Sequence, residues 1–300
     1  MTLKVEWLRG CATALVTPFK SDGAVDVERL TSLVGRQIEG GVRLLVPCGT
    51  TGESATLTEE EDRLVIRLTV EAARTSGARV IAGTGSNSTA AAIEYAREAR
   101  EMGADAVLVV APFYNKPTQD GLYAHFRAIA EAVAGLPVVI YNVPGRTASN
   151  IAAPTVLRLA RDVENIVAVK EASGDLSQIM SILRERPENF RVLSGDDALT
   201  LAMIALGADG VISVASNEAP DLMSRLCELA LAGSWEEARA LHFRLLPLME
   251  INFVESSPGP VKAAMRMMNL LEENFRLPLV PIQEKSRARV REVLAELGLL

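Results

Sequence analysis

The stretch IVAVKEAS (residues 166–173) is a short β-branched and apolar run that carries a lysine near its end. Runs of the same kind recur about every 25 to 35 residues, which indicates a series of short strands. The others are ATALVTPF (12–19), RLLVPCGT (43–50), RVIAGTG (79–85), AVLVVAPF (106–113), PVVIYNV (137–143), FRVLSGDD (190–197) and GVISVAS (210–216). Because these runs are apolar at almost every position, they predict a parallel sheet that is buried on both faces.

The segments between the runs have the apolar spacing of helices. Residues 57–74 and 89–103 show this spacing most clearly, and each has a threonine near its start that fits a helix N-cap. Eight strand–helix units favour a closed (β/α)8 barrel, a TIM barrel of the α/β class, over an open Rossmann sheet. We therefore predict that residues 1–233 form the barrel.

Residues 234–300 contain no further strand pattern. Helical stretches are expected there near 235–250, 258–271 and 284–298. These residues are predicted to form a C-terminal helical extension of the barrel.

The composition limits the class of protein. The 300 residues are 49% hydrophobic and 23% charged, which suits a large folded core. A net charge of −7 argues against binding to nucleic acid or to an anionic membrane. Three widely spaced cysteines without a CxxC pair predict reduced thiols, and the sequence has neither a signal-peptide core nor a long apolar run. We therefore expect a soluble, cytoplasmic protein.

Lys170 is the most informative single residue. Strand alternation places it on one face with the small residues Ala168 and Ala172, while Val167 and Val169 point to the other face. An ammonium group in such a place is costly to desolvate, so its pKa should fall. The free amine that results can attack a ketone and form an imine.

Two tyrosines at predicted strand ends could act beside this lysine. Tyr141 ends the preceding strand, and Tyr114 follows the strand before that. A phenol next to an imine-forming lysine can transfer protons. The competing interpretation makes Tyr141 a core aromatic residue, and makes Lys170 a residue that reaches water or pairs with Glu171. Position alone leaves both interpretations open.

Two further segments could bind carboxylates. Thr50, Thr51 and Gly52 offer hydroxyls and backbone amides in a tight loop, although turns of this kind are common. Arg146 follows a proline and a glycine, so its guanidinium could be held near the same end of the barrel. A solvated surface arginine is the simpler interpretation.

Other sites are weaker, and no cofactor or metal is expected. The glycine-rich residues 83–86 lack the dinucleotide and phosphate-binding fingerprints. Asp196 and Asp197 are adjacent, so on a strand they would point to opposite faces. His125 and His242 lie in separate helical segments and form no metal-ligand pair.

Taken together, these motifs resemble the dihydrodipicolinate synthase family, which also contains N-acetylneuraminate lyase and related keto-acid aldolases. The resemblance covers residues from about 10 to 300. It is carried by GTTGE (49–53), PFYNKP (112–117), YNVPGRT (141–147), KEA (170–172) and LSGDD (193–197).

The resemblance implies a role for each matching residue. Lys170 would form an imine with pyruvate, and Tyr141 would transfer protons through Thr50 and through Tyr114 of a neighbouring subunit. Thr51 would bind the pyruvate carboxylate, and Gly195 and Ile212 would line the pocket. Arg146 would bind the carboxylate of L-aspartate 4-semialdehyde, the second substrate. The family also implies a homotetramer.

Two features favour the synthase members over their relatives. The lyases that cleave N-acetylneuraminate or 2-keto-3-deoxy sugar acids usually vary the second threonine and lack the turn around Arg146. A non-catalytic metabolite-sensing barrel would not need a proton relay. A metal-dependent aldolase would need a ligand cluster that the sequence does not offer.

The resemblance also bears on regulation. Lysine-inhibited members bind the effector near the segments that here contain Glu59 and Ala91. A glutamate is expected at position 91, and Phe113 lacks the hydroxyl that is often used. Although Glu59 could act as the anionic partner, we expect lysine to regulate this protein weakly or not at all.

Overall fold

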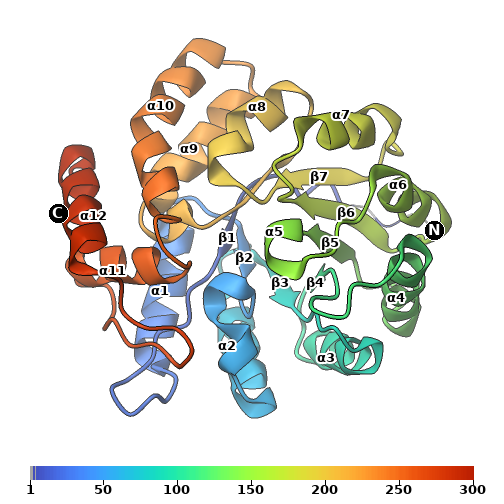
Figure 1. The fold of residues 1–300 in the computed structure, drawn as a ribbon, viewed down its shortest axis with the longest axis horizontal. Helices are drawn as coiled ribbons and strands as arrows, with labels where there is room; N and C mark the ends of the chain where they lie inside the picture. The colour runs from blue at the N-terminus through green and yellow to red at the C-terminus, as the bar shows by residue number, and fades with distance from the viewer. Residues whose placement is uncertain (1–2, 4) are drawn as a thin grey trace. The chain divides into compact units, whose positions relative to one another are not determined.

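The computed structural model describes residue 3 and residues 5–300. Eight parallel strands form a closed barrel in the order β1 to β8, as predicted, and they alternate with helices along the chain (Figure 1). The strands are β1 Gly10–Ala14, β2 Leu44–Val46, β3 Arg79–Gly83, β4 Ala106–Val110, β5 Val138–Asn142, β6 Ile166–Glu171, β7 Arg191–Ser194 and β8 Gly210–Ser213.

All eight predicted strands are present, and each is shorter than the apolar run that predicted it. The run 43–50 contributes only Leu44–Val46 to the sheet. Cys48 has a φ of 55°, and Thr50–Gly52 forms a 3-10 turn, so the chain leaves the ladder early. The residues after a strand therefore form loops, where their polar groups can be used.

The helices follow the predicted pattern. α2 begins after Thr58, whose side chain accepts a hydrogen bond from the Glu61 amide, while Glu61 caps Thr58 in return. The N-cap of α3 is Ser88, so the prediction of a threonine cap was wrong there. The helices are α1 Val27–Glu39, α2 Glu59–Ala73, α3 Thr89–Glu101, α4 Gln119–Ala132, α5 Pro144–Thr147, α6 Ala153–Asp162, α7 Leu176–Glu185, α8 Thr200–Ala205, α9 Pro220–Leu231, α10 Trp235–Ile251, α11 Gly259–Met267 and α12 Glu284–Leu297.

The chain divides into two units. The first unit comprises Met1–Gly10 and Ile81–Ile212, and the second comprises Cys11–Val80 and Ser213–Leu300. In the first unit, β4 to β7 pair in parallel, and the register places Tyr141 of β5 opposite Lys170 of β6.

The second unit joins the early part of the chain to its C-terminal helices. Helix α1 packs against α2 and α9, and α12 packs against α10 and α11. Its core includes Val16, Leu33, Val214, Val261, Met265 and Leu271. The helices predicted after residue 234 are present as α10, α11 and α12. The boundary at residue 233 between barrel and extension stays a prediction.

Two smaller expectations concern the described residues. Cys11, Cys48 and Cys227 are all buried, as expected for small hydrophobic residues. Within residues 3 and 5–300, none of the helices has the length and apolar character needed to cross a membrane.

Candidate active site

Lys170 lies inside the first unit, near the C-terminal end of β6. Only 6% of the residue is exposed, although a lysine side chain is long enough to reach water from many positions. The neighbouring carboxylate of Glu171 accepts hydrogen bonds from Asn142, Ser173 and Gln178. The Lys170 side chain therefore does not extend into water, and the Glu171 carboxylate is bound by Asn142, Ser173 and Gln178.

The environment of Lys170 favours its neutral form. Burial lowers the pKa of its ammonium from 10.5 to about 8, the carboxylate of Asp197 opposes this fall, and the guanidinium of Arg146 adds to it. With this pKa, about a tenth of the lysine is free amine at pH 7, far more than for a solvated lysine with a pKa of 10.5. This is the form that reacts with a carbonyl carbon.

Tyr141 is the aromatic neighbour of this amine. The Lys170 Nζ atom lies 4.3 Å from the centre of the Tyr141 ring, and the two residues are paired across β5 and β6. Burial raises the pKa of the Tyr141 phenol to about 12, against the opposing effect of Arg146. The phenol is therefore protonated at neutral pH and can act as a proton donor.

Gly195 follows β7 and packs directly on Lys170. A Cβ atom at this position would lie 3.0 Å from Lys170 Cε and 2.6 Å from the Ala172 Cβ atom. The Gly195 amide donates to the Glu171 carbonyl at 2.8 Å, so this approach is fixed by the backbone. Any larger residue would displace the lysine side chain.

Arg146 lies on the exposed surface of the short helix α5. The turn is closed by the amides of Arg146 and Thr147, which both donate to the Val143 carbonyl. The Thr147 hydroxyl donates to the Ser149 carbonyl at 2.9 Å, and Ala148 adopts a left-handed conformation. The guanidinium therefore projects from a fixed turn, and it affects the pKa values of Lys170 and Tyr141.

Asp197 is a residue that the sequence pattern does not assign to the lysine. It is 2% exposed and begins the 3-10 helix Asp197–Leu199. Its negative charge raises the pKa of Lys170, so it limits the effect of burial. The signals in the sequence are its place in the LSGDD motif and its position three residues after the end of β7.

Asn142, at the end of β5, connects β5 to Glu171 of β6 and to the loop at Ile151. Its side chain donates to both carboxylate oxygens of Glu171 at 3.1 Å and to Asn150, and its own oxygen accepts from the Ile151 amide. Burial raises the pKa of the Glu171 carboxyl, and hydrogen bonds from Ser173 and Asn142 oppose that effect. This network holds the ends of β5 and β6 in one register.

Tyr114 is not packed against the lysine in this chain. It is 89% exposed and has a φ of 73°, an unusual conformation for a residue with a side chain. Its loop is held by Asn115, which donates to the Asn87 carbonyl at 2.9 Å, and by Asn87, which donates to the Phe113 carbonyl. The loop therefore presents the phenol to the surroundings.

Ile212 is 1% exposed in β8, at the end of the first unit. The described structure assigns it no contact with Lys170. Its predicted place in the pocket lining stays a prediction.

Thr50 and Thr51 lie in the second unit, in the 3-10 turn after β2. Thr51 is buried and Thr50 is exposed. The turn is closed by the Gly52 amide, which donates to the Gly49 carbonyl at 3.0 Å. The Gly52 carbonyl accepts a hydrogen bond of 2.7 Å from the Thr17 hydroxyl. Successive backbone amides in such a turn suit a carboxylate.

His125 and Asp196, whose side chains could in principle bind a metal, make hydrogen bonds within the protein. His125 is buried, its Nδ1 atom lies 2.9 Å from the Thr89 hydroxyl, and burial lowers its pKa to about 4. It is a packing residue and not a surface residue. Asp196 caps the turn that follows it by accepting from the Ala198 amide. Within residues 3 and 5–300, no three His, Cys, Asp or Glu side chains gather as metal ligands would.

Comparison with known proteins decides the family. The model of the dihydrodipicolinate synthetase family matches residues 7–297. The chain belongs to the dihydrodipicolinate synthetase family. The 4-hydroxy-tetrahydrodipicolinate synthase of Koribacter versatilis is 54% identical over 294 residues, which cover 98% of this chain and 97% of that protein.

Solved structures of this family have the same fold. One is a dihydrodipicolinate synthase from Cyanidioschyzon merolae with lysine bound, with a TM-score of 0.96, 44% identity and coverage of 99% and 100% of the two chains. Another is the chloride-inhibited enzyme from Acinetobacter baumannii in complex with pyruvate, with a TM-score of 0.95, 43% identity and coverage of 97% and 99%. The predicted family and barrel are confirmed, and the chain is an enzyme.

Proposed function

We propose that this enzyme condenses pyruvate with L-aspartate 4-semialdehyde to give 4-hydroxy-tetrahydrodipicolinate, on the route to diaminopimelate and lysine, with Lys170 as the imine-forming residue. The observation that carries the proposal is the buried Lys170 amine, 4.3 Å from the Tyr141 ring, with a pKa of about 8. The synthase named for the relative at 54% identity supports the choice of reaction.

The reaction begins at the Lys170 amine. The amine attacks the ketone carbon of pyruvate, and loss of water from the carbinolamine gives the imine. Loss of a proton from the methyl carbon then gives an enamine. The enamine carbon attacks the aldehyde of the second substrate, whose own amino group then attacks the imine carbon. This last step closes the ring and releases Lys170.

Tyr141 supplies and removes the protons of these steps. Its phenol is protonated at neutral pH, because burial raises its pKa to about 12. Loss of water from the carbinolamine needs a proton on the departing hydroxyl, which the adjacent phenol donates. Thr50 and a Tyr114 from a neighbouring subunit relay this proton to solvent. The exposure of Tyr114 on its own chain supports a role in another subunit.

Two carboxylates need binding sites, one on each substrate. Thr51 and the backbone amides of its turn bind the carboxylate of pyruvate. Arg146 binds the carboxylate of L-aspartate 4-semialdehyde, because a guanidinium can hold both oxygens of a carboxylate at once. The rigid turn of α5 supports this role, since it fixes the origin of the arginine side chain.

Gly195 and Ile212 line the space around the imine. Gly195 leaves room for Lys170 to carry a substrate, and Ile212 adds an apolar wall. The enzyme is a cytoplasmic homotetramer, in which shared sites explain the exposed Tyr114. Three buried thiols fit a reducing compartment.

Borohydride trapping tests the proposed function directly. Pyruvate and borohydride should place a reduced three-carbon adduct on the peptide that contains Lys170, and Lys170→Ala should abolish both the adduct and the synthase activity. Lys285→Ala, which changes an exposed lysine on α12, is the matched control and should keep both. Turnover of N-acetylneuraminate in place of L-aspartate 4-semialdehyde, or an adduct on another lysine, would overturn the proposal.

A further inference from the structure

Glu53 follows the Thr50–Gly52 turn in the second unit, and its side chain has 0% exposed surface. Its φ of 55° lies in the left-handed region, which is unfavourable for a residue with a side chain. A buried carboxylate is also costly to desolvate unless it is paired. Both features indicate that other parts of this unit hold Glu53 in place.

Lys262 of helix α11 is the partner of Glu53, and its side chain is also 0% exposed. The ammonium donates to Glu53 Oε1 at 2.5 Å, to the Asn274 carbonyl at 2.6 Å and to the Thr17 carbonyl at 3.2 Å. These contacts use all three donors of the group. The Phe19 and Phe275 rings face the ammonium with centres 4.6 Å and 4.8 Å away.

Thr17 forms a second link between Lys262 and the turn. While its carbonyl accepts from Lys262, its hydroxyl donates to the Gly52 carbonyl at 2.7 Å. Gly52 packs so closely that a Cβ atom there would lie 3.0 Å from the Leu15 carbonyl oxygen and 3.2 Å from the Thr17 hydroxyl. Lys262 is therefore connected to the turn by two routes. It binds Glu53, which follows the turn, and it binds Thr17, whose hydroxyl donates to the Gly52 carbonyl.

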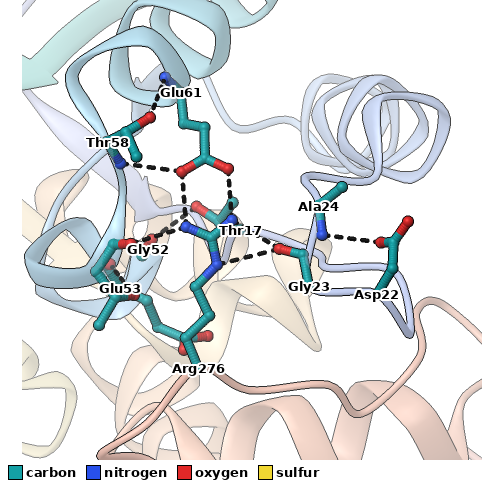
Figure 2. A network of polar contacts seen from close by, with 10 residues as sticks. Thr17, Asp22, Gly23, Ala24, Gly52, Glu53, Thr58, Glu61 and Arg276 are labelled. Atoms are coloured by element: carbon teal, nitrogen blue, oxygen red, sulfur yellow. Dashed lines mark hydrogen bonds and ion pairs between the residues drawn. The ribbon is translucent and has the colours of Figure 1, made fainter.

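Arg276 fixes the chain that leaves the turn. Its guanidinium donates to the Thr56 carbonyl at 2.7 Å, to both oxygens of Glu61 and to the Gly23 carbonyl. Figure 2 shows Arg276 between Glu61 and Gly23, with Thr17, Gly52 and Glu53 close by. The segment from Lys262 to Arg276 thus holds both ends of the loop after β2.

We propose that Lys262 is a positioning residue for the carboxylate of pyruvate. Through Glu53 and Thr17, it holds the Thr50–Gly52 turn in the conformation whose amides and hydroxyls bind that carboxylate. The inference rests on the proposed function, because it assumes that this turn binds pyruvate. Lys262 itself does not touch the substrate and acts only through the turn.

Stability alone is a poor explanation for such a pair. Burial lowers the pKa of the Lys262 ammonium, and Glu53 opposes that fall. A buried ion pair contributes little net stability, because the cost of desolvation offsets the attraction, and apolar replacements of similar volume are often tolerated. The contribution of the pair is to position the chain. Three hydrogen bonds from Lys262 Nζ hold the segments that contain Thr17, Glu53 and Asn274.

The decisive variant is Lys262→Met/Glu53→Gln, which removes both charges and keeps the volume of the pair. Borohydride trapping at Lys170 across a range of pyruvate concentrations reports pyruvate binding separately from the second substrate. Half-maximal trapping should need about tenfold more pyruvate, the loss typical of a weakened hydrogen bond to a charged group. The KM for L-aspartate 4-semialdehyde should stay within about twofold, because the loosened turn does not bind it.

Two further variants separate positioning from general loss of stability. Glu53→Gln alone keeps an oxygen for Lys262 and should cause a smaller rise of about threefold; it decides the matter if the double variant does not fold. Leu245→Ala opens a cavity at a 0% exposed residue of α10 in the same unit, so it should lower the melting temperature and leave trapping unchanged.

Unchanged trapping in a folded double variant would overturn the inference. Parallel losses for both substrates, matched by Leu245→Ala, would also overturn it, because they would show a purely structural pair. If the unmodified enzyme forms no pyruvate adduct on Lys170, the proposed function fails first and the inference falls with it.

Discussion

Replacing Lys170 with methionine tests how strongly the fold disfavours a buried ammonium. Methionine has a similar length and no charge, so Lys170→Met should abolish imine formation and also make the folded state more stable at pH 7. The gain follows from the pKa of Lys170, which falls from 10.5 to about 8 on folding. At about 1.4 kcal/mol per pKa unit, the protonated side chain costs the folded state about 3 kcal/mol.

The pH dependence gives this prediction its sign. Below pH 8, Lys170 is protonated in both the folded and unfolded states, so the whole cost is present. Between pH 8 and 10.5 the folded state has released the proton and the unfolded state has not, so the stability of the unmodified protein rises with pH. Above 10.5 both states are neutral and the cost is gone. The advantage of Lys170→Met should therefore shrink between pH 8 and 10.5.

Urea unfolding followed by circular dichroism at pH 7 and at pH 10.5 measures the difference. Comparing the unmodified protein with Lys170→Met at each pH cancels the contribution to stability of groups that titrate in both proteins. Lys285→Met, on the exposed face of α12, is the control and should show no such pH dependence. If Lys170→Met gained equal stability at the two pH values, or lost stability at pH 7, the buried ammonium would not be the cause. The rate of borohydride trapping in the unmodified protein should rise with pH and level off above about 8.

Four other outcomes are expected. Arg146→Ala should lower kcat/KM for L-aspartate 4-semialdehyde by about one to two decades, the typical loss of a charge-assisted pair, with a smaller effect on pyruvate trapping at pH 8; equal effects would make the residue structural. Gly195→Ala should reduce trapping at least about tenfold because its methyl group displaces the lysine, while Gly35→Ala in α1, where a Cβ meets nothing within 4 Å, should leave trapping intact. Mixed oligomers of Tyr114→Phe and Lys170→Ala subunits should regain activity that neither parent has, and confirmed hybrids without recovery would argue against shared sites. Titration with millimolar L-lysine at subsaturating pyruvate should cause weak inhibition or none, and strong saturable inhibition would contradict this.

The surroundings of the predicted effector residues bear on the last of these outcomes. Glu59, the possible anionic partner, forms an ion pair of 3.7 Å with Arg63 one helical turn away. Ala91 lies in the first turn of α3 and has no charge to offer. Phe113 is 40% exposed, and the Asn87 side chain donates a hydrogen bond to the Phe113 carbonyl.

The sequence determined the barrel and the position of its central lysine. Apolar runs of strand length repeat along the chain, and each run is decided by neighbouring residues, so local pattern is enough to find it. The alternation within β6 also predicted that Lys170 and Ala172 share a face, and both lie against Gly195. Strand ends were less certain: the run 190–197 contributes only Arg191–Ser194 to the sheet, because Gly195 and Asp197 belong to the loop beyond. Hydrogen bonds to distant segments decide such ends, and a single run does not contain them.

The groups that surround the site residues come together only when the chain folds. The approach of Gly195 to Lys170 and the influence of Asp197 depend on the register between β6 and β7. The pair of Glu53 and Lys262 is more remote still, because its members lie 209 positions apart. Glu53 ends the GTTGE motif, but no local pattern connects it to Lys262. Periodicity records which side of a strand or helix a residue faces. It does not record which distant residue arrives on that side, because that is fixed only when the whole chain packs.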